Sequence, residues 1–447
     1  MRGVTMRGVT AVAKGSVKIV SIGAASIFGR GILADVLGSP EFNDLDTTLV
    51  LVDINREALD RIYRLGLLMK EHLGSKVKLE ATTDRLEALP GADYVITSVA
   101  ILRYELWEQD FRVPLAFGFK HVLGENGGPG AIFHALRNYE LMLPIARDME
   151  RLCPGALLLN FTNPEPKIVK AITELTSISC VGLCHGVQSS REGVSQILER
   201  PVDELEIIAG GHNHFFWVTK IRDRKTGEDL YPALRKRVLE DPNCPQAPPL
   251  VKKMVEIFGL YTYPSDDHIG EYLQFASEFT GVLWHYGLET KRVPRDGLKP
   301  EPWPYEDYLT GRKPVDDELT HKTGEVAIPI ILDIELDRKR WECAVNVPND
   351  GLYVENLPDY MVVEVPAIVD RNGVHPEKIG PLPDALAAYC SRQAVIQKLL
   401  VEAYQKRSKN LLLQCLLLDP VVDSVSRAEK MLDYMLDLQR DFLPEFK

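Results

Sequence analysis

The stretch Val17-Lys18-Ile19-Val20-Ser21-Ile22-Gly23, followed by the small residues Ala24-Ala25-Ser26, decides the fold that this chain predicts. Its apolar and β-branched run is typical of a buried strand that ends in a tight turn. A helical segment through residue 37, an apolar run at 48–53, a helical segment at 55–74 and strands near 77–81 and 94–99 follow it. This alternation predicts an α/β protein with a doubly wound parallel sheet.

The turn after the first strand has the features of a dinucleotide site. Such a site needs backbone N–H groups near a pyrophosphate at a helix N-terminus, and an acid that reaches the adenosine ribose. Gly23, Ala25, Ser26 and Ile27 supply the turn, and Asp53 ends the second strand. Asp53 alone could equally be a turn residue at a strand end. Together with the turn it predicts a dinucleotide site that prefers NAD to NADP, because its carboxylate would repel a 2′-phosphate.

Composition excludes several classes of protein. The 447 residues carry a net charge of −12 without a long block of Lys and Arg, which argues against a nucleic-acid partner. The chain contains no run of about eighteen apolar residues, so no membrane-spanning helix is predicted. The seven cysteines are scattered and include no CxxC pair, which argues against a disulfide framework or a structural zinc site. We therefore expect a cytoplasmic protein without a membrane partner.

The chain divides into three parts by its patterning. Residues 1–15 repeat Met-Arg-Gly-Val-Thr and predict a mobile tail, and residues 16–200 predict the dinucleotide-binding Rossmann-type domain. Beyond residue 200 the alternation gives way to longer mixed segments, with strand-like runs at 205–209 and 215–218 and helical runs at 381–418 and 423–440. Residues 201–447 therefore predict an α+β domain.

Three segments are expected to meet near the carboxyl edge of the sheet: Asn163-Pro164, Cys184-His185 and His212-Asn213-His214. A thiolate with an imidazole leaves open coordination positions on a divalent transition metal, which suits Lewis-acid chemistry on a hydroxyl or carbonyl oxygen. A buried cysteine beside hydrogen-bonded core histidines is the alternative interpretation.

Two further segments have both a structural and a functional interpretation. The glycine-rich turn at 125–131 is either a plain loop and helix start or a loop whose backbone approaches a ligand closely. The titratable cluster at 263–272 is either a solvated helix start or the source of a general base, for which Asp266, His268 and Tyr272 are the candidates.

In this order, the segments resemble glycoside hydrolase family 4, the NAD- and metal-dependent glycosidases, over nearly the whole length after the tail. The matching segments are the turn at 23–26, residues 125–137, Asn160-x-Thr162-Asn163-Pro164, Cys184-His185, Asn213-His214-Phe215, Ser265-Asp266-x-His268 with Glu271, and residues 345–349 with 356–358. The resemblance implies a fold like that of lactate and malate dehydrogenases, in which the second domain holds substrate and metal.

The resemblance also implies the roles of particular residues. Cys184 and His214 would bind the metal, typically Mn²⁺, and His185 would be the general acid. Asp266 would be the base that removes the C2 proton, with Tyr272 in reserve.

Four residues are expected to contact the sugar: Glu125, Arg137, Asn163 and His268. The implied reaction oxidises C3 by hydride transfer to NAD, removes the C2 proton, eliminates the C1 leaving group, adds water and returns the hydride. A His directly after the metal-binding Cys resembles members that act on unphosphorylated α-hexosides or hexuronides. Arg137, Arg292 and Arg295 are the candidate cations for a sugar carboxylate.

A dehydrogenase for 2-hydroxy acids, of the lactate or malate type, is the main alternative, since it shares the sheet, the Asn-Pro turn and a Gly-x-His segment. It has no use for a Cys-His metal pair. By resemblance to the family, the protein is expected to be a homodimer or homotetramer.

Overall fold

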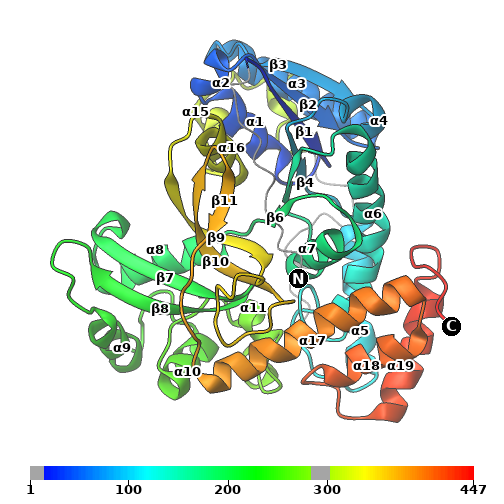
Figure 1. Ribbon diagram of the computed structural model, residues 1–447, viewed down its shortest axis with the longest axis vertical. Coiled ribbons are helices and arrows are strands. Elements are labelled where there is room, and N and C mark those ends of the chain that lie inside the picture. The colour runs from blue at the N-terminus through cyan, green and yellow to red at the C-terminus, as the bar shows by residue number, and fades with distance from the viewer. Residues whose placement is uncertain (1–14, 283–302) are drawn as a thin grey trace.

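The computed structural model describes residues 15–282 and 303–447, and its described strands form one sheet of 11 strands (Figure 1). Six parallel strands come first, in the spatial order β3-β2-β1-β4-β5-β6. They are β1 (Val17–Ile22), β2 (Thr47–Val52), β3 (Lys78–Thr82), β4 (Tyr94–Thr97), β5 (Leu157–Asn160) and β6 (Cys180–Gly182). This order is that of a Rossmann-type sheet, which confirms the predicted fold class.

Helices connect these strands and cover both faces of the sheet. They are α1 (Gly29–Leu37), α2 (Glu41–Asp44), α3 (Arg56–Leu73), α4 (Arg85–Ala88), α5 (Arg103–Ala116), α6 (Gly130–Leu152), α7 (Glu165–Leu175) and α8 (Gly186–Leu198). Alternate residues of β1 enter two different cores: Ile19 packs in the cluster that includes α1 and α3, and Val20 in the cluster that includes α6. A strand buried on both faces is a continuous apolar run, which is why the first stretch of sequence predicts it.

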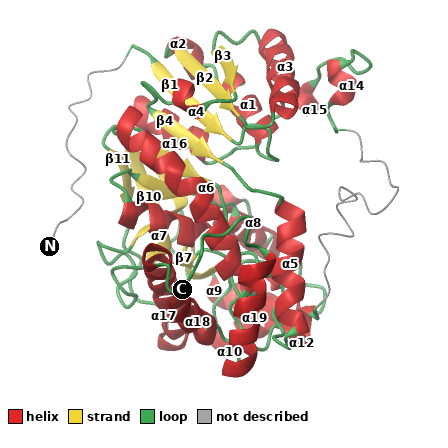
Figure 2. Cartoon of the chain, turned by 90° about the vertical axis from the view of Figure 1, so that its right-hand side faces the viewer, coloured by secondary structure: helices red, strands yellow, loops and turns green. Residues whose placement is uncertain are grey.

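The second half of the chain extends the same sheet with antiparallel strands. Gly182 of β6 pairs with Asn346 of β9, and the order continues β9-β10-β7-β8. The bounds are β7 (Leu205–His212), β8 (Phe215–Asp223), β9 (Arg340–Pro348), β10 (Val362–Asp370) and β11 (Gly373–Pro376), which pairs with β10. Figure 2 shows the strands following one another from β3 at the top down to β7. A single sheet therefore crosses the predicted boundary at residue 200.

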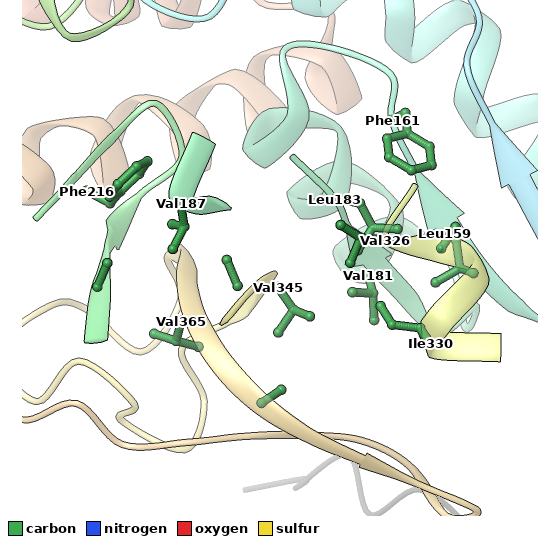
Figure 3. Packing of buried hydrophobic residues seen from close by; sticks show 14 of the residues in the cluster. Leu159, Phe161, Val181, Leu183, Val187, Phe216, Val326, Ile330, Val345 and Val365 are labelled. Carbon is green, nitrogen blue, oxygen red and sulfur yellow. The ribbon is translucent and has the colours of Figure 1, made fainter. Parts of the chain in front are cut away.

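The remaining helices surround this extension. They are the 3-10 helix η1 (Val202–Glu204), α9 (Tyr231–Glu240), α10 (Pro249–Phe258), α11 (Asp266–Gly270), α12 (Ser277–Thr280), α14 (Glu306–Leu309), α15 (Asp317–Thr320), α16 (Ala327–Glu335), α17 (Asp384–Lys406), α18 (Lys409–Leu418) and α19 (Val425–Leu438). Val326 and Ile330, at α16, pack against apolar side chains of β5, β6 and β9 beneath the end of β6 (Figure 3). This core holds the Cys184 segment in place.

The C-terminal helical prediction is wrong in one detail, because residues 381–418 form two helices. Arg407 adopts a left-handed conformation with φ of 52° and ends α17, and the side chain of Ser408 accepts a hydrogen bond from the N–H of Leu411 to start α18. A residue in the left-handed conformation typically ends one helix, and a serine N-cap begins the next.

Some of the residues named in the sequence predictions are not described by the structure. Residues 1–14 of the predicted tail, and the candidate cations Arg292 and Arg295, lie outside the described residues. Among the helices of the described ranges, none combines the length and the apolar character that crossing a bilayer requires.

Candidate active site

A cavity of about 510 Å³ lies at the carboxyl ends of β1, β2 and β4. All five residues predicted to bind the dinucleotide line it: Gly23, Ala25, Ser26, Ile27 and Asp53. Asn163, His134 and Arg103 also line it, so the cavity extends from the first strand to the Asn-Pro turn. The structure thus joins the predicted dinucleotide site and the Asn-Pro turn in one cavity.

The turn after β1 has features that suit an anion bound close to its backbone. Gly23 has φ of +82°, and a Cβ there would lie 2.1 Å from the carbonyl oxygen of Ser98, so only glycine is accommodated. No side chain caps the start of α1, and its first turn has no acid. The hydroxyl of Ser26 is buried and has no hydrogen-bond partner. A helix N-terminus without an acid and an unpaired hydroxyl beside it are features that a bound pyrophosphate would satisfy, so these residues fit the dinucleotide.

Asp53 is held rigidly at the edge of this cavity. One carboxylate oxygen accepts the N–H of Ala25 at 3.1 Å, and the other accepts the N–H of Asn55 at 2.9 Å. Each oxygen has a second lone pair for a ribose hydroxyl.

The predicted sugar-binding residues Glu125 and Asn163 lie together. The amide of Asn163 donates to Oε1 of Glu125 at 3.2 Å, and Arg103 donates to the same oxygen at 3.0 Å. Asn163 precedes a cis proline, and its carbonyl accepts a hydrogen bond from the Asn138 amide. Glu125 therefore stands where the dinucleotide cavity meets the end of the Asn-Pro turn.

Cys184 and His214 approach the site from β6 and from the turn between β7 and β8. His214 has φ of +63° in that turn, and its ring lies 5.7 Å from the ring of Tyr263. A Cβ on Gly186, two residues after Cys184, would lie 3.5 Å from a ring carbon of Tyr263. The Cys184 segment and His214 therefore both approach Tyr263.

Electrostatics show the state of these two groups. Burial, followed by the neighbouring Glu364, raises the pKa of the Cys184 thiol to about 12. Burial lowers the pKa of His214 to about 3, so its ring is neutral and carries a lone pair. A thiol that a metal can deprotonate and a neutral imidazole fit a divalent transition metal. Within the described residues, no group of three or more His, Cys, Asp or Glu side chains is arranged to hold a metal ion.

His185, the predicted general acid, lies at the start of α8 with its side chain 39% exposed. Its Nε2 is 3.2 Å from a carboxylate oxygen of Glu325, and this contact raises the pKa of His185. Its ring also stacks on Phe161, which lines the dinucleotide cavity. A protonated imidazole that solvent can reach is suited to donate a proton.

Asp266, the residue that the resemblance favours as the base, caps the start of a helix instead. Both of its carboxylate oxygens accept backbone N–H groups at the start of α10, from Leu250 and Val251, each at 3.0 Å. The next residue, Asp267, is the acid in the site: it accepts hydrogen bonds from Ser265 at 2.5 Å and from Nδ1 of His268 at 2.7 Å. The ring of His268 lies 4.7 Å from that of His214. The structure therefore favours Asp267 and His268 over Asp266.

Tyr272, the reserve base, is 2% exposed and donates to the carbonyl of Asn213 at 3.3 Å. Burial raises the pKa of Tyr272 well above its usual value of 10, which opposes the ionised form that a base needs.

Arg137, a predicted sugar contact, is 3% exposed and fully paired away from the site. It donates to both carboxylate oxygens of Asp110, at 2.5 and 2.9 Å, and to Gln439 at 2.7 Å. Its role is structural, and the expectation of a substrate contact is corrected.

The sequence did not single out several polar residues around the site. Asn126, Glu165, Lys167 and Glu364 are buried, Asp267 is partly exposed, and Glu271 appeared there only inside a matching segment. Glu364 accepts from Asn213 at 3.1 Å and from Asn346 at 3.3 Å, and burial raises its pKa to about 7. A lone acid in the apolar run Val362-Val363-Glu364-Val365 was the available signal, because a charge is almost never buried without partners.

Comparisons with known proteins show the family of this chain. The model of the family 4 glycosyl hydrolases matches residues 18–200, and that of the family 4 glycosyl hydrolase C-terminal domain matches residues 209–422. An α-glucosidase of Erwinia rhapontici is 31% identical, and the alignment covers 96% of this chain and 99% of that protein.

Solved structures share the fold. A 6-phospho-α-glucosidase from gut microorganisms, in complex with NAD and Mn²⁺, has a TM-score of 0.83 at 23% identity over 97% of this chain and 100% of that one. The malate dehydrogenase of Aeropyrum pernix has a TM-score of 0.51 at 16% identity over 86% of this chain and 97% of that one, which confirms the predicted dehydrogenase-like fold. With both family models matched along most of its length, the chain belongs to glycosyl hydrolase family 4.

Proposed function

We propose that this protein uses NAD and Mn²⁺ to hydrolyse the O-glycosidic bond of an unphosphorylated α-hexoside or hexuronide. The observation that carries the proposal is the continuity of the site: one cavity runs from the dinucleotide turn to Asn163, which is bonded to Glu125, and His214 contacts the next residue of that loop, Asn126. A single sugar bound at Asn163 can therefore face both a hydride acceptor and a metal.

The two bound groups would supply distinct chemistry. Gly23, Ala25, Ser26, Ile27 and Asp53 would hold NAD, whose nicotinamide accepts and returns a hydride. Cys184 and His214 would hold Mn²⁺, which supplies Lewis acidity toward a sugar oxygen. Oxidation at C3 makes the C2 proton acidic, so that elimination of the C1 leaving group replaces direct displacement.

The chain's own side chains would then move the protons. The base that removes the C2 proton is the pair Asp267 and His268, because these groups face His214 while Asp266 caps α10. Burial lowers the pKa of His268, but the hydrogen bond to Asp267 and the charges of Asp267, Glu271 and Glu125 together raise it above its usual value. His185, whose pKa the contact with Glu325 raises, would donate to the leaving oxygen. Glu125 and Asn163 would bind the sugar hydroxyls.

The preference for an unphosphorylated sugar rests on His185 directly after Cys184. The described residues add one argument, since the two arginines that line the cavity are already paired, Arg85 with Asp148 and Arg103 with Glu125. A paired arginine is a poor site for a phosphate dianion.

A substrate panel tests the proposal. The full-length protein is incubated with nitrophenyl α-glucoside, α-galactoside and α-galacturonide, and with a 6-phospho-α-glucoside. Each assay contains NAD, Mn²⁺ and a thiol reductant. We expect release of nitrophenol from an unphosphorylated substrate that stops when NAD is omitted or a chelator is added. Release that ignores both, or net NADH production with a 2-hydroxy acid, would overturn the proposal in favour of another hydrolase or of a dehydrogenase.

We also propose that the protein acts in the cytoplasm as a homodimer or homotetramer. All seven cysteines are unpaired, which suits a reducing compartment. Exposed apolar side chains on α19, Val425, Tyr434 and Leu438, would be covered in an assembly. Light scattering on the full-length protein measures the subunit number, and a monomeric mass would contradict the assembly.

A further inference from the structure

Glu271 lies between the two halves of the proposed site. It follows α11 directly and is 2% exposed. Its Oε1 accepts two backbone hydrogen bonds from the glycine-rich loop, from the N–H of Glu125 at 2.6 Å and of Asn126 at 2.8 Å. The side chain of Glu271, directly after α11, therefore fixes the loop that carries the proposed sugar-binding residue Glu125.

The second oxygen of this carboxyl group points to the other half. Oε2 of Glu271 is buried without a hydrogen-bond partner and lies 3.9 Å from Nδ1 of His214. That distance is too long for a hydrogen bond, and closing it needs a movement of about 1 Å. The two backbone hydrogen bonds to Oε1 hold the carboxyl group in this orientation.

Asn126 holds the imidazole in a different arrangement in this structure. Its Oδ1 accepts the N–H of Glu165 at 3.2 Å, so its NH₂ group must face His214 and donate to Nδ1 at 3.2 Å. A neutral ring that accepts at Nδ1 carries its proton on Nε2. With this tautomer, Nε2 has no lone pair for a metal.

We propose that Glu271 is the positioning residue for the metal ligand His214: its Oε2 accepts a hydrogen bond from Nδ1–H when Mn²⁺ is bound, which leaves the Nε2 lone pair for the metal. Metal-bound histidines usually donate their second ring N–H to a carboxylate or carbonyl, and Oε2 is the unpartnered oxygen at Nδ1. Because Oε1 of the same group holds Glu125, the metal and the sugar-binding loop are aligned by one side chain. This inference rests on the proposed metal site.

The test is the Mn²⁺ affinity of the full-length, metal-free Glu271→Gln variant, measured from the electron paramagnetic resonance of free Mn²⁺. The new amide keeps an oxygen for the loop N–H groups but presents a donor to Nδ1, which then faces two donors. We expect the dissociation constant for Mn²⁺ to rise about 10- to 100-fold, with NAD affinity and the thermal unfolding of the metal-free protein near wild type.

Asp419→Asn is the matched control. Asp419 is also a buried acid, 4% exposed, and the charge of Lys167 acts on it as it does on Glu271, but its carboxyl group caps the N–H of Val421 instead of facing His214. We expect wild-type Mn²⁺ affinity. An equal loss of affinity in Asp419→Asn, or wild-type affinity in a folded Glu271→Gln protein, overturns the inference.

Two results separate this inference from the proposed function. If the wild type binds no Mn²⁺, or if Cys184→Ser binds it as tightly as the wild type, the proposed metal site itself fails. If Glu271→Gln does not fold, ¹⁵N-histidine NMR of the wild type loaded with Zn²⁺ decides, with the His214 signals assigned by their loss in His214→Gln. A proton on Nδ1 supports the inference, and a proton on Nε2 overturns it.

Discussion

The carboxylate of Asp266 accepts the backbone N–H of Leu250 at 3.0 Å and so caps α10. Its neighbour Asp267 instead contacts His268 and Ser265 beside the proposed metal ligand. Two consecutive acids at the start of a short helix therefore have different partners: Asp266 caps α10, and Asp267 binds His268.

This difference predicts opposite effects of two substitutions. Asp266→Ala should lower the free energy of unfolding by about 1 kcal/mol, the usual cost of a lost cap, and leave kcat near wild type. Asp267→Asn should keep the stability and lower kcat by about 10² to 10⁴, the range for loss of general base catalysis. Chemical denaturation and steady-state kinetics measure both. Slower exchange of solvent deuterium into C2 of the product in Asp267→Asn would locate the defect at the base step, whereas a catalytic loss in Asp266→Ala alone would restore Asp266 as the base.

Cys184→Ser should lose metal-dependent turnover and keep NAD affinity, because the thiolate is a proposed ligand while the dinucleotide cavity is lined by other residues. We expect the Mn²⁺ dissociation constant to rise by more than about 100-fold, beyond the effect of an outer partner. Mn²⁺ titration and NAD fluorescence quenching provide the two readouts. Cys390→Ser, at a buried cysteine next to the Phe215 carbonyl, is the control and should bind Mn²⁺ as the wild type does.

Ser26→Ala should act in opposite directions on stability and on cofactor binding. Without cofactor the hydroxyl is buried and unpaired, so its removal should leave the protein at least as stable. If the hydroxyl bonds the pyrophosphate, the loss of about 0.5–1.5 kcal/mol weakens NAD binding roughly 2- to 12-fold. Calorimetric titration with NAD and thermal unfolding without it measure the two effects. An unchanged affinity would place the pyrophosphate elsewhere.

Arg137→Met should unfold the protein more readily without a specific effect on KM. Removing one partner of a buried ion pair leaves Asp110, which is fully buried, without its guanidinium, at a cost of about 3–5 kcal/mol. Urea denaturation should show this loss. A stable variant whose KM alone rises would instead support a substrate contact.

The stability of the metal-free protein should depend on Asp419 in a pH-specific way. Burial raises the pKa of this carboxyl group to about 7, and Lys167, Arg392 and Glu271 are the charged groups that act on it. Since the folded state holds the proton longer than the unfolded state, the contribution of Asp419 is fully present below about pH 4 and is lost as the pH rises through 7.

Asp419→Asn removes that contribution. Between pH 5 and pH 8 the wild type should therefore lose more stability than the variant, by about 1.4 kcal/mol for each pH unit between 5 and the folded-state pKa of about 7. Urea unfolding at the two pH values measures the difference, and parallel pH profiles would contradict it.

The fold could be predicted because its signals are local. The apolar run of β1, the turn at Gly23 and the acid at Asp53 lie within short windows, and periodicity reports burial on one or both faces of a strand. The order of the motifs likewise identified the family, and the resemblance to that family implied Cys184 and His214 as the candidate ligands.

Tertiary structure alone decided which of these candidates face the site. Asp266 and Asp267 are indistinguishable in a window of sequence, and only the packing of α11 against α10 assigns one to a cap and the other to His268. Arg137 looked like a cation for substrate until Asp110, 27 residues away, was found to pair with it. The link from Glu271 to the loop spans 146 residues. A sequence determines which groups are present and how they repeat along an element, but hydrogen bonds between distant elements depend on where the folded chain places them, which no local pattern contains.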